Sequence, residues 1–324
     1  MKILLSMPAD GQSNDYIVNA LQDLGHEVFY CDHRRFLEKC YEVVPAIMKL
    51  ANIDLMLVLY LVENKTYSKE YIDILKAKFP NVKYAAWIFD TTINGQYCDE
   101  SDSFVDLMKR YDYFFTVCRG QVESFKKQDV NAYFLPEGFS PYMRNLNFLS
   151  YSSKKKYDIT FIGQIGSKTV HQERMPLLKS IIDFYSNTRI WGALFDNETE
   201  ILKHHAQRPT FNDIEHSRIV AESRINLGHS GWSHIDGYFS ARNYRIMGTG
   251  GFLLANHSKN VEEFFEPDVE AVFYKDNQEC LDKIKYYLKN ESEREAISKK
   301  GILKVLQKHT FNHRLEEMIK IIKE

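Results

Sequence analysis

An alternation of short apolar runs with longer helical stretches, present in both halves of the chain, constrains the fold most strongly. In the first half, Lys2–Met7 is predicted to be a strand, Ser13–Leu24 a helix and Gly25–Tyr30 the next strand. Further strands are predicted at 54–60, 82–89 and 113–117, with a helix over 68–79. Continuous apolar strands separated by helices are typical of a parallel sheet covered on both faces. The first half is therefore predicted to be a doubly wound α/β domain.

The alternation restarts after Tyr151–Lys156, a polar and basic stretch that is predicted to link two domains. Tyr157–Gly163 is the next predicted strand, followed by strands at 188–191, 225–227 and 251–255 and helices at 174–185, 211–222, 242–248, 278–289 and 291–308. We expect domains over 1–150 and 151–308, and a C-terminal helix over 309–324 that docks back across them. Two Rossmann-like domains bind ligands at the carboxyl ends of their strands, so the cleft between them is the expected active site.

Composition excludes several classes of protein. The chain has 324 residues, of which 44% are hydrophobic and 27% charged, which argues against a disordered, collagen-like or coiled-coil protein. The net charge of -2 gives no overall attraction to nucleic acid. The longest apolar run, Leu55–Val62, is far shorter than the roughly 20 residues that cross a bilayer. The run before Pro8 is too short for a secretory signal, and the five cysteines include no C-x-x-C pair, so we expect a cytoplasmic protein.

Ser240–Ala255 is the most informative segment. A helix opens there beside a polar, glycine-containing loop and ends on small residues before a buried strand. This arrangement places Arg242 and backbone N–H groups where they can hold an anion such as a phosphate. Alternatively, Gly248, Gly250 and Gly251 only permit a tight turn from helix to strand. Spacing alone leaves both interpretations open.

This segment and the Val261–Pro267 stretch that follows resemble CgeB-type glycosyltransferases of the GT-B superfamily. The similarity extends through 157–163, 223–227 and 309–314, and more loosely through 87–90 and 135–139. The resemblance implies two facing Rossmann-like domains with a cleft between them. It also implies that the second domain binds a nucleotide-sugar donor, while the first supplies the acceptor site and the catalytic base.

The resemblance further implies a set of donor-binding residues. These are Arg242 on the diphosphate, Gly163, Gln164 and Gly166 in the loop facing the donor, and Arg224, Gly250 and Gly251 around the phosphates. Arg245 stands where the family carries a glutamate that holds the ribose hydroxyls, and a cation cannot accept those hydrogen bonds. Either Asp236 or a neighbouring carboxylate replaces that glutamate, or Arg245 adds a second charge to the diphosphate, or Arg245 points away from the site.

Transfer to a hydroxyl requires a group that removes the acceptor proton. Asp90 is the first candidate, because it ends an apolar strand and would stand at the carboxyl edge of the sheet. Asp10, in the loop after the first strand, is the second. Asp90 could instead cap its turn, and a reaction that retains the anomeric configuration needs no such base. The sequence contains no Asp-x-Asp and no histidines at recognised ligand spacing, so no metal cofactor is predicted.

The sequence therefore predicts a metal-independent hexosyl- or pentosyltransferase that uses a nucleotide sugar as co-substrate and acts on a glycan, a protein or another hydroxyl acceptor. The basic stretches 34–36, 125–127 and 154–156 would favour DNA as the acceptor, with a hydroxymethylated base flipped out of the duplex, although a solvated surface also explains each of them. The same scaffold could also serve a catalytically silent nucleotide-sugar binding protein or a sugar epimerase.

Overall fold

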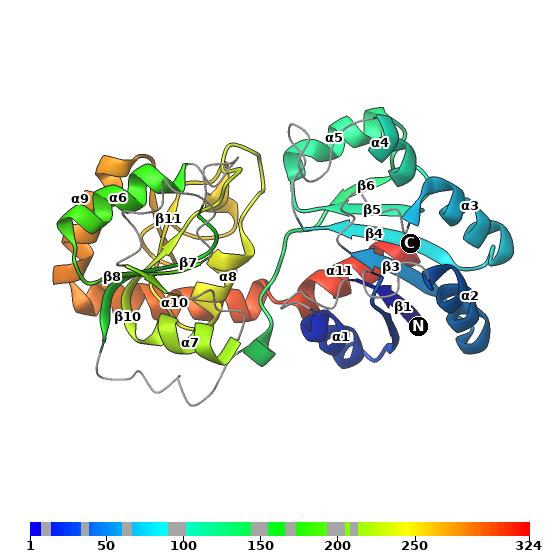
Figure 1. Cartoon of the computed structure of the whole chain (residues 1–324), viewed down its shortest axis with the longest axis horizontal. Helices are drawn as coiled ribbons and strands as arrows, with labels where there is room; N and C mark the ends of the chain where they lie inside the picture. Colours follow the sequence, from blue (N-terminus) through cyan, green and yellow to red (C-terminus); the bar gives the residue numbers. More distant parts are fainter. Residues whose placement is uncertain are drawn as a thin grey trace. The chain divides into compact units, whose positions relative to one another are not determined.

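The chain folds into two compact units, seen in a computed structural model that describes residues 1–7, 14–33, 39–59, 67–89, 102–143, 155–165, 173–192, 205–207 and 213–324. One unit consists of Met1–Pro136 with Phe311–Glu324, and the other of Glu137–Thr310. Each unit is a parallel sheet with helices packed on it (Figure 1). The predicted class of two Rossmann-like α/β domains is confirmed. The chain passes between the units after Pro136 and after Thr310, whereas the sequence placed these crossings at 150 and 308.

The first unit contains a six-stranded parallel sheet in the order β2-β1-β3-β4-β5-β6. Its strands are β1 (Lys2–Ser6), β2 (Glu27–Cys31), β3 (Leu55–Leu59), β4 (Lys83–Ile88), β5 (Tyr113–Thr116) and β6 (Ala132–Phe134). Its helices are α1 (Asn14–Asp23), α2 (Cys40–Ala51), α3 (Lys69–Lys78), α4 (Asp102–Met108), α5 (Arg119–Lys127) and α11 (Phe311–Lys323). Every residue of β3 is buried, as expected for a central strand with both faces covered.

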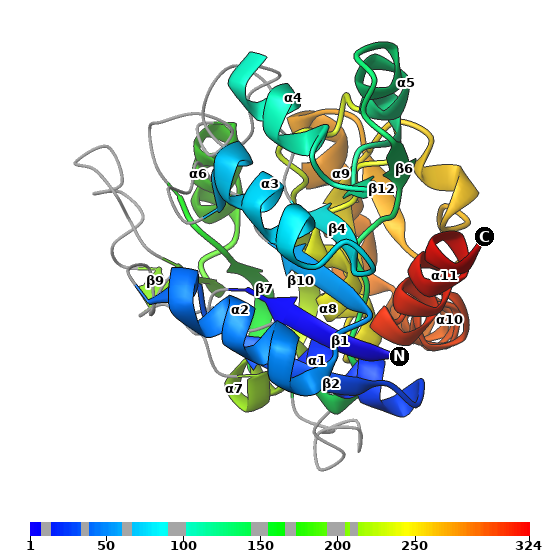
Figure 2. The same ribbon diagram turned by 90° about the vertical axis from the view of Figure 1, so that its right-hand side faces the viewer.

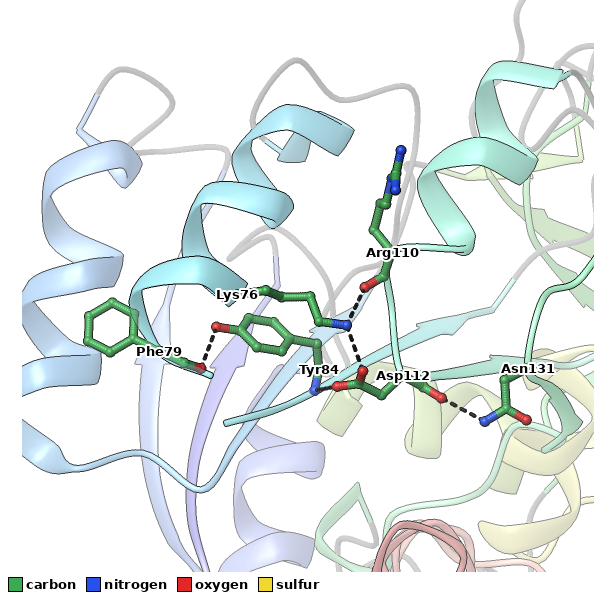
Figure 3. Close-up of polar contacts among 6 residues, drawn as sticks. All are labelled: Lys76, Phe79, Tyr84, Arg110, Asp112 and Asn131. Carbon is green, nitrogen blue, oxygen red and sulfur yellow. Dashed lines mark hydrogen bonds and ion pairs between the residues drawn. The ribbon is translucent and has the colours of Figure 1, made fainter. Parts of the chain in front are cut away.

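A polar cluster closes the amino edge of this sheet (Figure 3). Asp112, just before β5, accepts hydrogen bonds from the Tyr84 backbone N–H at 2.8 Å and from Lys76 Nζ at 2.6 Å. Lys76 also donates to the Arg110 carbonyl at 3.0 Å, and Asn131 donates to the Asp112 carbonyl at 2.7 Å. These contacts tie α3 to the beginnings of β4 and β5.

The helix α11 completes the first unit, although the whole second unit precedes it in the sequence. Drawn in red, it lies beside the blue N-terminal part of the chain (Figure 1 and Figure 2) and packs against α1. Asn312 donates to Asp23 at 3.1 Å, and the Tyr113 hydroxyl donates to the Ile322 carbonyl at 3.3 Å. The helix therefore packs within the first unit, and its predicted docking across both domains stays a prediction.

The second unit contains another six-stranded parallel sheet, in the order β12-β11-β10-β7-β8-β9. Its strands are β7 (Tyr157–Ile162), β8 (Thr188–Trp191), β9 (Ala206–Gln207), β10 (Ser223–Gly228), β11 (Leu253–Asn256) and β12 (Val272–Tyr274). Its helices are α6 (Arg174–Phe184), α7 (Asp213–Ala221), α8 (Ala241–Gly248), α9 (Asn277–Lys289) and α10 (Glu291–Lys308). One hydrophobic core joins this sheet to α6 and α9.

Candidate functional site

The carboxyl edge of the second sheet fixes the beginning of α8. Ser230 follows β10 and exchanges two hydrogen bonds with Asn256 at the end of β11, at 2.8 and 2.9 Å. The Ser230 hydroxyl also accepts hydrogen bonds from the backbone N–H of Ser240 at 3.3 Å and from Asn243 Nδ2 at 3.2 Å. Both donors belong to the first turn of α8 or to its cap. The two strand ends therefore hold the N-terminus of this helix, where backbone N–H groups favour an anion.

Arg242, in the first turn of α8, is held by main-chain carbonyls. Its Nε donates to the Ile162 carbonyl at 2.5 Å, and its Nη1 donates to the His229 carbonyl at 2.8 Å. The guanidinium carbon lies 5.1 Å from the centre of the Phe161 ring. Burial lowers the pKa of Arg242 to about 10, so the side chain remains cationic at neutral pH. Among the described residues, no carboxylate forms an ion pair with it.

Gly163, which directly follows β7, leaves space for this guanidinium. A Cβ at Gly163 would clash with Arg242 Nη2, and a Cβ at the neighbouring Gly192 would clash with the Gly163 carbonyl. The predicted loop after β7 thus lies against Arg242, and its glycine is required by close packing. Gln164 is exposed, and its carbonyl accepts a hydrogen bond from a second arginine, Arg174. Gly166 lies outside the described residues.

Arg174, the first residue of α6, is the site residue that sequence reasoning missed. Only 5% of it is exposed, and its guanidinium carbon lies 5.7 Å from the centre of the same Phe161 ring. Its Nη1 donates to the Gln164 carbonyl at 2.7 Å, whereas its buried Nε has no hydrogen-bond partner within the described part of the chain. Burial, and then the charge of Arg242, lower the pKa of Arg174 to about 9.

A sequence signal could have identified Arg174. Both α6 and α8 have an arginine and no acidic residue in their first turn. The helix dipole disfavours a cation at this end, so an arginine there suggests a function other than helix stability. Together, Arg174 and Arg242 place two positive charges on one aromatic ring without a paired carboxylate in the described residues. This arrangement can bind a ligand with two negative charges through charge-assisted hydrogen bonds.

Three predicted donor-binding residues lie at the opposite edge of the sheet. Arg224 is near the amino end of β10 and pairs with Asp158 at 3.5 Å. Gly250 and Gly251 follow the last turn of α8. This helix has 8 residues and is therefore roughly 12 Å long, so the two glycines lie at the end of the helix away from Arg242. Gly250 has a φ of +87°, and a Cβ at Gly251 would clash with Val220. These glycines permit the turn into β11, and the structure brings none of the three residues to Arg242.

Arg245 lies one turn after Arg242 on α8 and is half-buried. Its charge acts on His216 of α7: burial, then Arg245 and then Arg242, lower the pKa of His216 to about 3, so this imidazole is neutral. The predicted substitute for the ribose-binding glutamate, Asp236, accepts a hydrogen bond from Asn260 at 2.9 Å. Arg245 is therefore close enough to Arg242 for its charge to lower the pKa of that residue. Asp236 is hydrogen-bonded to a residue of a neighbouring loop.

Both candidate bases and part of the basic surface stay predictions, because Asp10, Asp90 and residues 34–36 lie outside the described residues. Of the linker lysines, Lys155 donates to the Ala221 carbonyl at 2.8 Å and Lys156 pairs with Glu222 at 2.6 Å, so both tie the segment before β7 to the end of α7. The described residues contain no group of three or more histidine, cysteine or acidic side chains suited to a metal. Their helices include none long and apolar enough to cross a membrane.

A family of known proteins matches the part of the chain that contains both Arg174 and Arg242. Residues 174–320 match a family described as glycosyl transferase-like, a stretch that begins at Arg174 and includes all of α8. No functionally curated protein is similar enough to the chain to count as a relative.

Several solved structures share this fold. Sucrose-phosphate synthase from Thermosynechococcus elongatus is 9% identical with a TM-score of 0.69, over 100% of this chain and 98% of that one. HepE from Anabaena, in complex with UDP-glucose, is 10% identical with a TM-score of 0.68, over 100% and 99%. A glycosyltransferase from Rickettsia africae is 12% identical with a TM-score of 0.65, over 99% and 97%. Such identities establish the fold alone, which is that of two Rossmann-like α/β domains.

Proposed function

We propose that this protein is a glycosyltransferase whose nucleotide-sugar donor places its diphosphate between Arg174 and Arg242. The observation that carries the proposal is the pair of guanidinium groups on Phe161, at 5.7 and 5.1 Å, without an ion-paired carboxylate in the described residues. A diphosphate supplies the two missing negative charges and matches the planar donors of arginine. The family match over residues 174–320 and the fold support the same assignment.

In the reaction, the bond between the anomeric carbon and the diphosphate oxygen breaks, and a bond to the acceptor oxygen forms. The acceptor proton passes to a base, for which Asp90 and Asp10 in the first unit are the candidates. Negative charge develops on the leaving diphosphate, where Arg242, Arg174 and the N–H groups at the start of α8 stabilise it. These two arginines supply the charge that a divalent ion provides in other transferases, so the proposed reaction is metal-independent. A CgeB-type specificity and a cytoplasmic location belong to the same proposal.

Titration calorimetry with nucleoside diphosphates tests the proposal, beginning with UDP because HepE has been solved with UDP and with UDP-glucose. Arg174→Met and Arg242→Met keep the bulk of the side chain and remove the charge. Each is expected to weaken binding about 10- to 100-fold, the loss of one or two charge-assisted hydrogen bonds. The control is Arg224→Met, which removes an arginine from the opposite edge of the same sheet and should leave the affinity unchanged. Equal affinity in all four proteins would refute the proposal.

Product analysis then separates transfer from epimerisation and from silent binding. Incubation with the bound nucleotide sugar and no acceptor should release the free sugar slowly at most. Conversion of the donor into an isomeric nucleotide sugar would instead indicate an epimerase. Binding without any turnover across a panel of glycan, protein and hydroxymethylated DNA acceptors would indicate a silent binding protein.

A further inference from the structure

A histidine and a glutamate form a pair at the carboxyl edge of the second sheet, directly after β11. His257 Nε2 and Glu262 Oε1 are 2.6 Å apart, and the two side chains are 31% and 52% exposed. The hydrogen bond from His257 lowers the pKa of Glu262, which is therefore an ionised carboxylate at neutral pH. A carboxylate only accepts hydrogen bonds, so Nε2 carries the shared proton. Nδ1 is then left to accept a hydrogen bond whenever the imidazole is neutral.

The pair is held in a fixed position by its surroundings. The His257 backbone N–H donates to the Tyr274 carbonyl at 2.7 Å, and the His257 ring meets the Phe273 ring edge-on, with 6.4 Å between their centres. Asn260, which lies between the two residues of the pair, donates to Asp236 at 2.9 Å. Contacts with β12 and with the loop that leads into α8 therefore pre-organise the polar atoms of the pair, as a binding site requires.

The strand order places this pair near Arg242. Part of the sheet runs β11-β10-β7-β8, so the switch point at which such sheets bind ligands lies between β10 and β7. Arg242 donates to a main-chain carbonyl at or just after the end of each of these two strands. Ser230, after β10, exchanges two hydrogen bonds with Asn256, the residue before His257. Because β11 is two strands away from β7, the separation along the sheet edge is roughly 10 Å.

A nucleotide sugar matches this spacing, because a ring with neighbouring hydroxyl groups flanks its diphosphate on either side. With the diphosphate on Arg242 and the donor lying along the sheet edge, one of these rings lies on the side of β11. We propose that His257 and Glu262 form a hydroxyl-binding subsite for that ring, in which His257 Nδ1 accepts from one hydroxyl and the Glu262 carboxylate from its neighbour. The subsite supplies the acceptors that the cation Arg245 cannot offer. The inference rests on the proposed function.

Calorimetry with four ligands tests the subsite and identifies the ring. UDP-glucose contains both rings, and UDP contains only the ribose. The β-methyl ester of UDP has the charge of the donor without its sugar, and 2′,3′-dideoxy-UDP has the charge of UDP without the ribose hydroxyls. His257→Leu removes both ring nitrogens, and Glu262→Met removes the carboxylate. Each change should weaken the ligands that carry the bound hydroxyls about 3- to 30-fold, the loss of one or two hydrogen bonds, and leave the others unchanged.

The two rings give different patterns, and either pattern supports the inference. If the ribose is bound, all ligands except dideoxy-UDP lose affinity. If the transferred sugar is bound, only UDP-glucose does. His257→Gln should keep part of the affinity, because its amide can donate to Glu262 and accept from a hydroxyl. The control is Glu293→Gln, which alters an exposed carboxylate that accepts from the Tyr286 hydroxyl at 2.8 Å, and it should bind all four ligands like the wild type.

Other patterns would overturn the inference. Equal losses for all four ligands would show that the pair only supports the fold of the sheet edge, and unchanged affinities in both variants would show an ordinary surface ion pair. In either case the proposed function stands. The losses in the double variant should also be smaller than the sum of the single losses, because each side chain orients the other. Thermal melting verifies that each variant folds. If the wild type binds neither these ligands nor any other nucleoside diphosphate, the proposed function fails and the inference falls with it.

Discussion

Arg174 and Arg242 lie in the first turns of two different helices, yet their guanidinium carbons lie 5.7 and 5.1 Å from the centre of one phenylalanine ring. The positive charge of Arg242 lowers the pKa of Arg174, so each folded molecule holds these cations against their mutual repulsion. Phe161, on β7, offsets part of this repulsion because the face of an aromatic ring attracts cations. An anionic ligand would remove the rest of it, and the protein should therefore be most stable when that ligand is bound.

Replacing Phe161 by leucine should weaken both the binding of the nucleoside diphosphate and the stability of the folded protein. The change removes the shared ring and keeps an apolar side chain, so we expect binding of the nucleoside diphosphate to weaken about 3- to 30-fold, as the loss of one to two cation–π contacts would cause. Calorimetry measures the affinity and thermal melting the stability. The matched control is Phe184→Leu, at a residue that is 72% exposed at the end of α6. A Phe161→Leu protein with unchanged affinity would contradict the role of the ring.

Gly163→Ala tests the packing of Arg242 against the loop after β7. The new Cβ would clash with the Arg242 guanidinium, so this side chain must move and its hydrogen bond to Ile162 must break. We expect nucleotide binding to weaken at least tenfold. Gly25→Ala is the control, because its φ of +80° makes alanine unfavourable while no atom lies within 4 Å of the new Cβ. That variant should lose about 1 kcal/mol of stability and none of its affinity.

His216 should make the stability of the protein depend on pH. Its pKa is lowered from 6.5 to about 3, mainly by burial, so the unfolded chain binds a proton at a pH where the folded chain does not. The neutral imidazole therefore contributes fully above pH 6.5, and its contribution is lost progressively as the pH falls from 6.5 toward 3. In urea unfolding, the free energy of unfolding of His216→Leu should fall less than that of the wild type over this range. The difference between the two losses should reach several kcal/mol at about pH 4. His234→Gln, at an exposed residue, should follow the wild-type curve.

Asp112→Asn should destabilise the first unit without affecting the proposed donor site. The carboxylate accepts hydrogen bonds from the Tyr84 N–H and from Lys76, and an amide replaces only part of this set. We expect a loss of about 1–3 kcal/mol in denaturant unfolding. Asp106→Asn breaks an exposed pair with Lys69, at 3.7 Å, and should cost less than about 1 kcal/mol. Weaker nucleotide binding in Asp112→Asn would show that the two units are energetically coupled.

Apolar patterning predicted much of this architecture because a parallel sheet buries its strands completely. The strand Thr188–Trp191 and the helix Glu291–Lys308 were predicted with the bounds that the structure has. The helix Cys40–Ala51 was not predicted; it contains Pro45, a residue that usually argues against a helix interior. The crossings between the units also differ from the prediction, because a polar stretch without periodicity need not be the place where the chain leaves one core for another.

The candidate site was predicted less completely, for a different reason. Arg242 was predicted because it lies at the start of a helix beside a glycine-containing loop and because its segment resembles a known family, whereas Arg174 was predicted only as the start of a helix. Patterns along the chain do not show which side chains meet over a common ring such as Phe161. The position of Arg224 at the amino end of its strand could have been predicted. Arg224 comes before the predicted strand 225–227, and in a parallel sheet a residue at that end lies on the edge away from ligands.

The return of α11 to the first unit has a consequence for the order of folding during synthesis. Residues 137–310 leave the ribosome before α11 exists, so the nascent first unit must wait with the surface of α1 uncovered while the second unit is made. Domains generally fold as units in the order in which they emerge. In this chain the second unit can finish folding first, although it begins later in the sequence. The first unit reaches its final packing only after the last strand of the second unit has been translated.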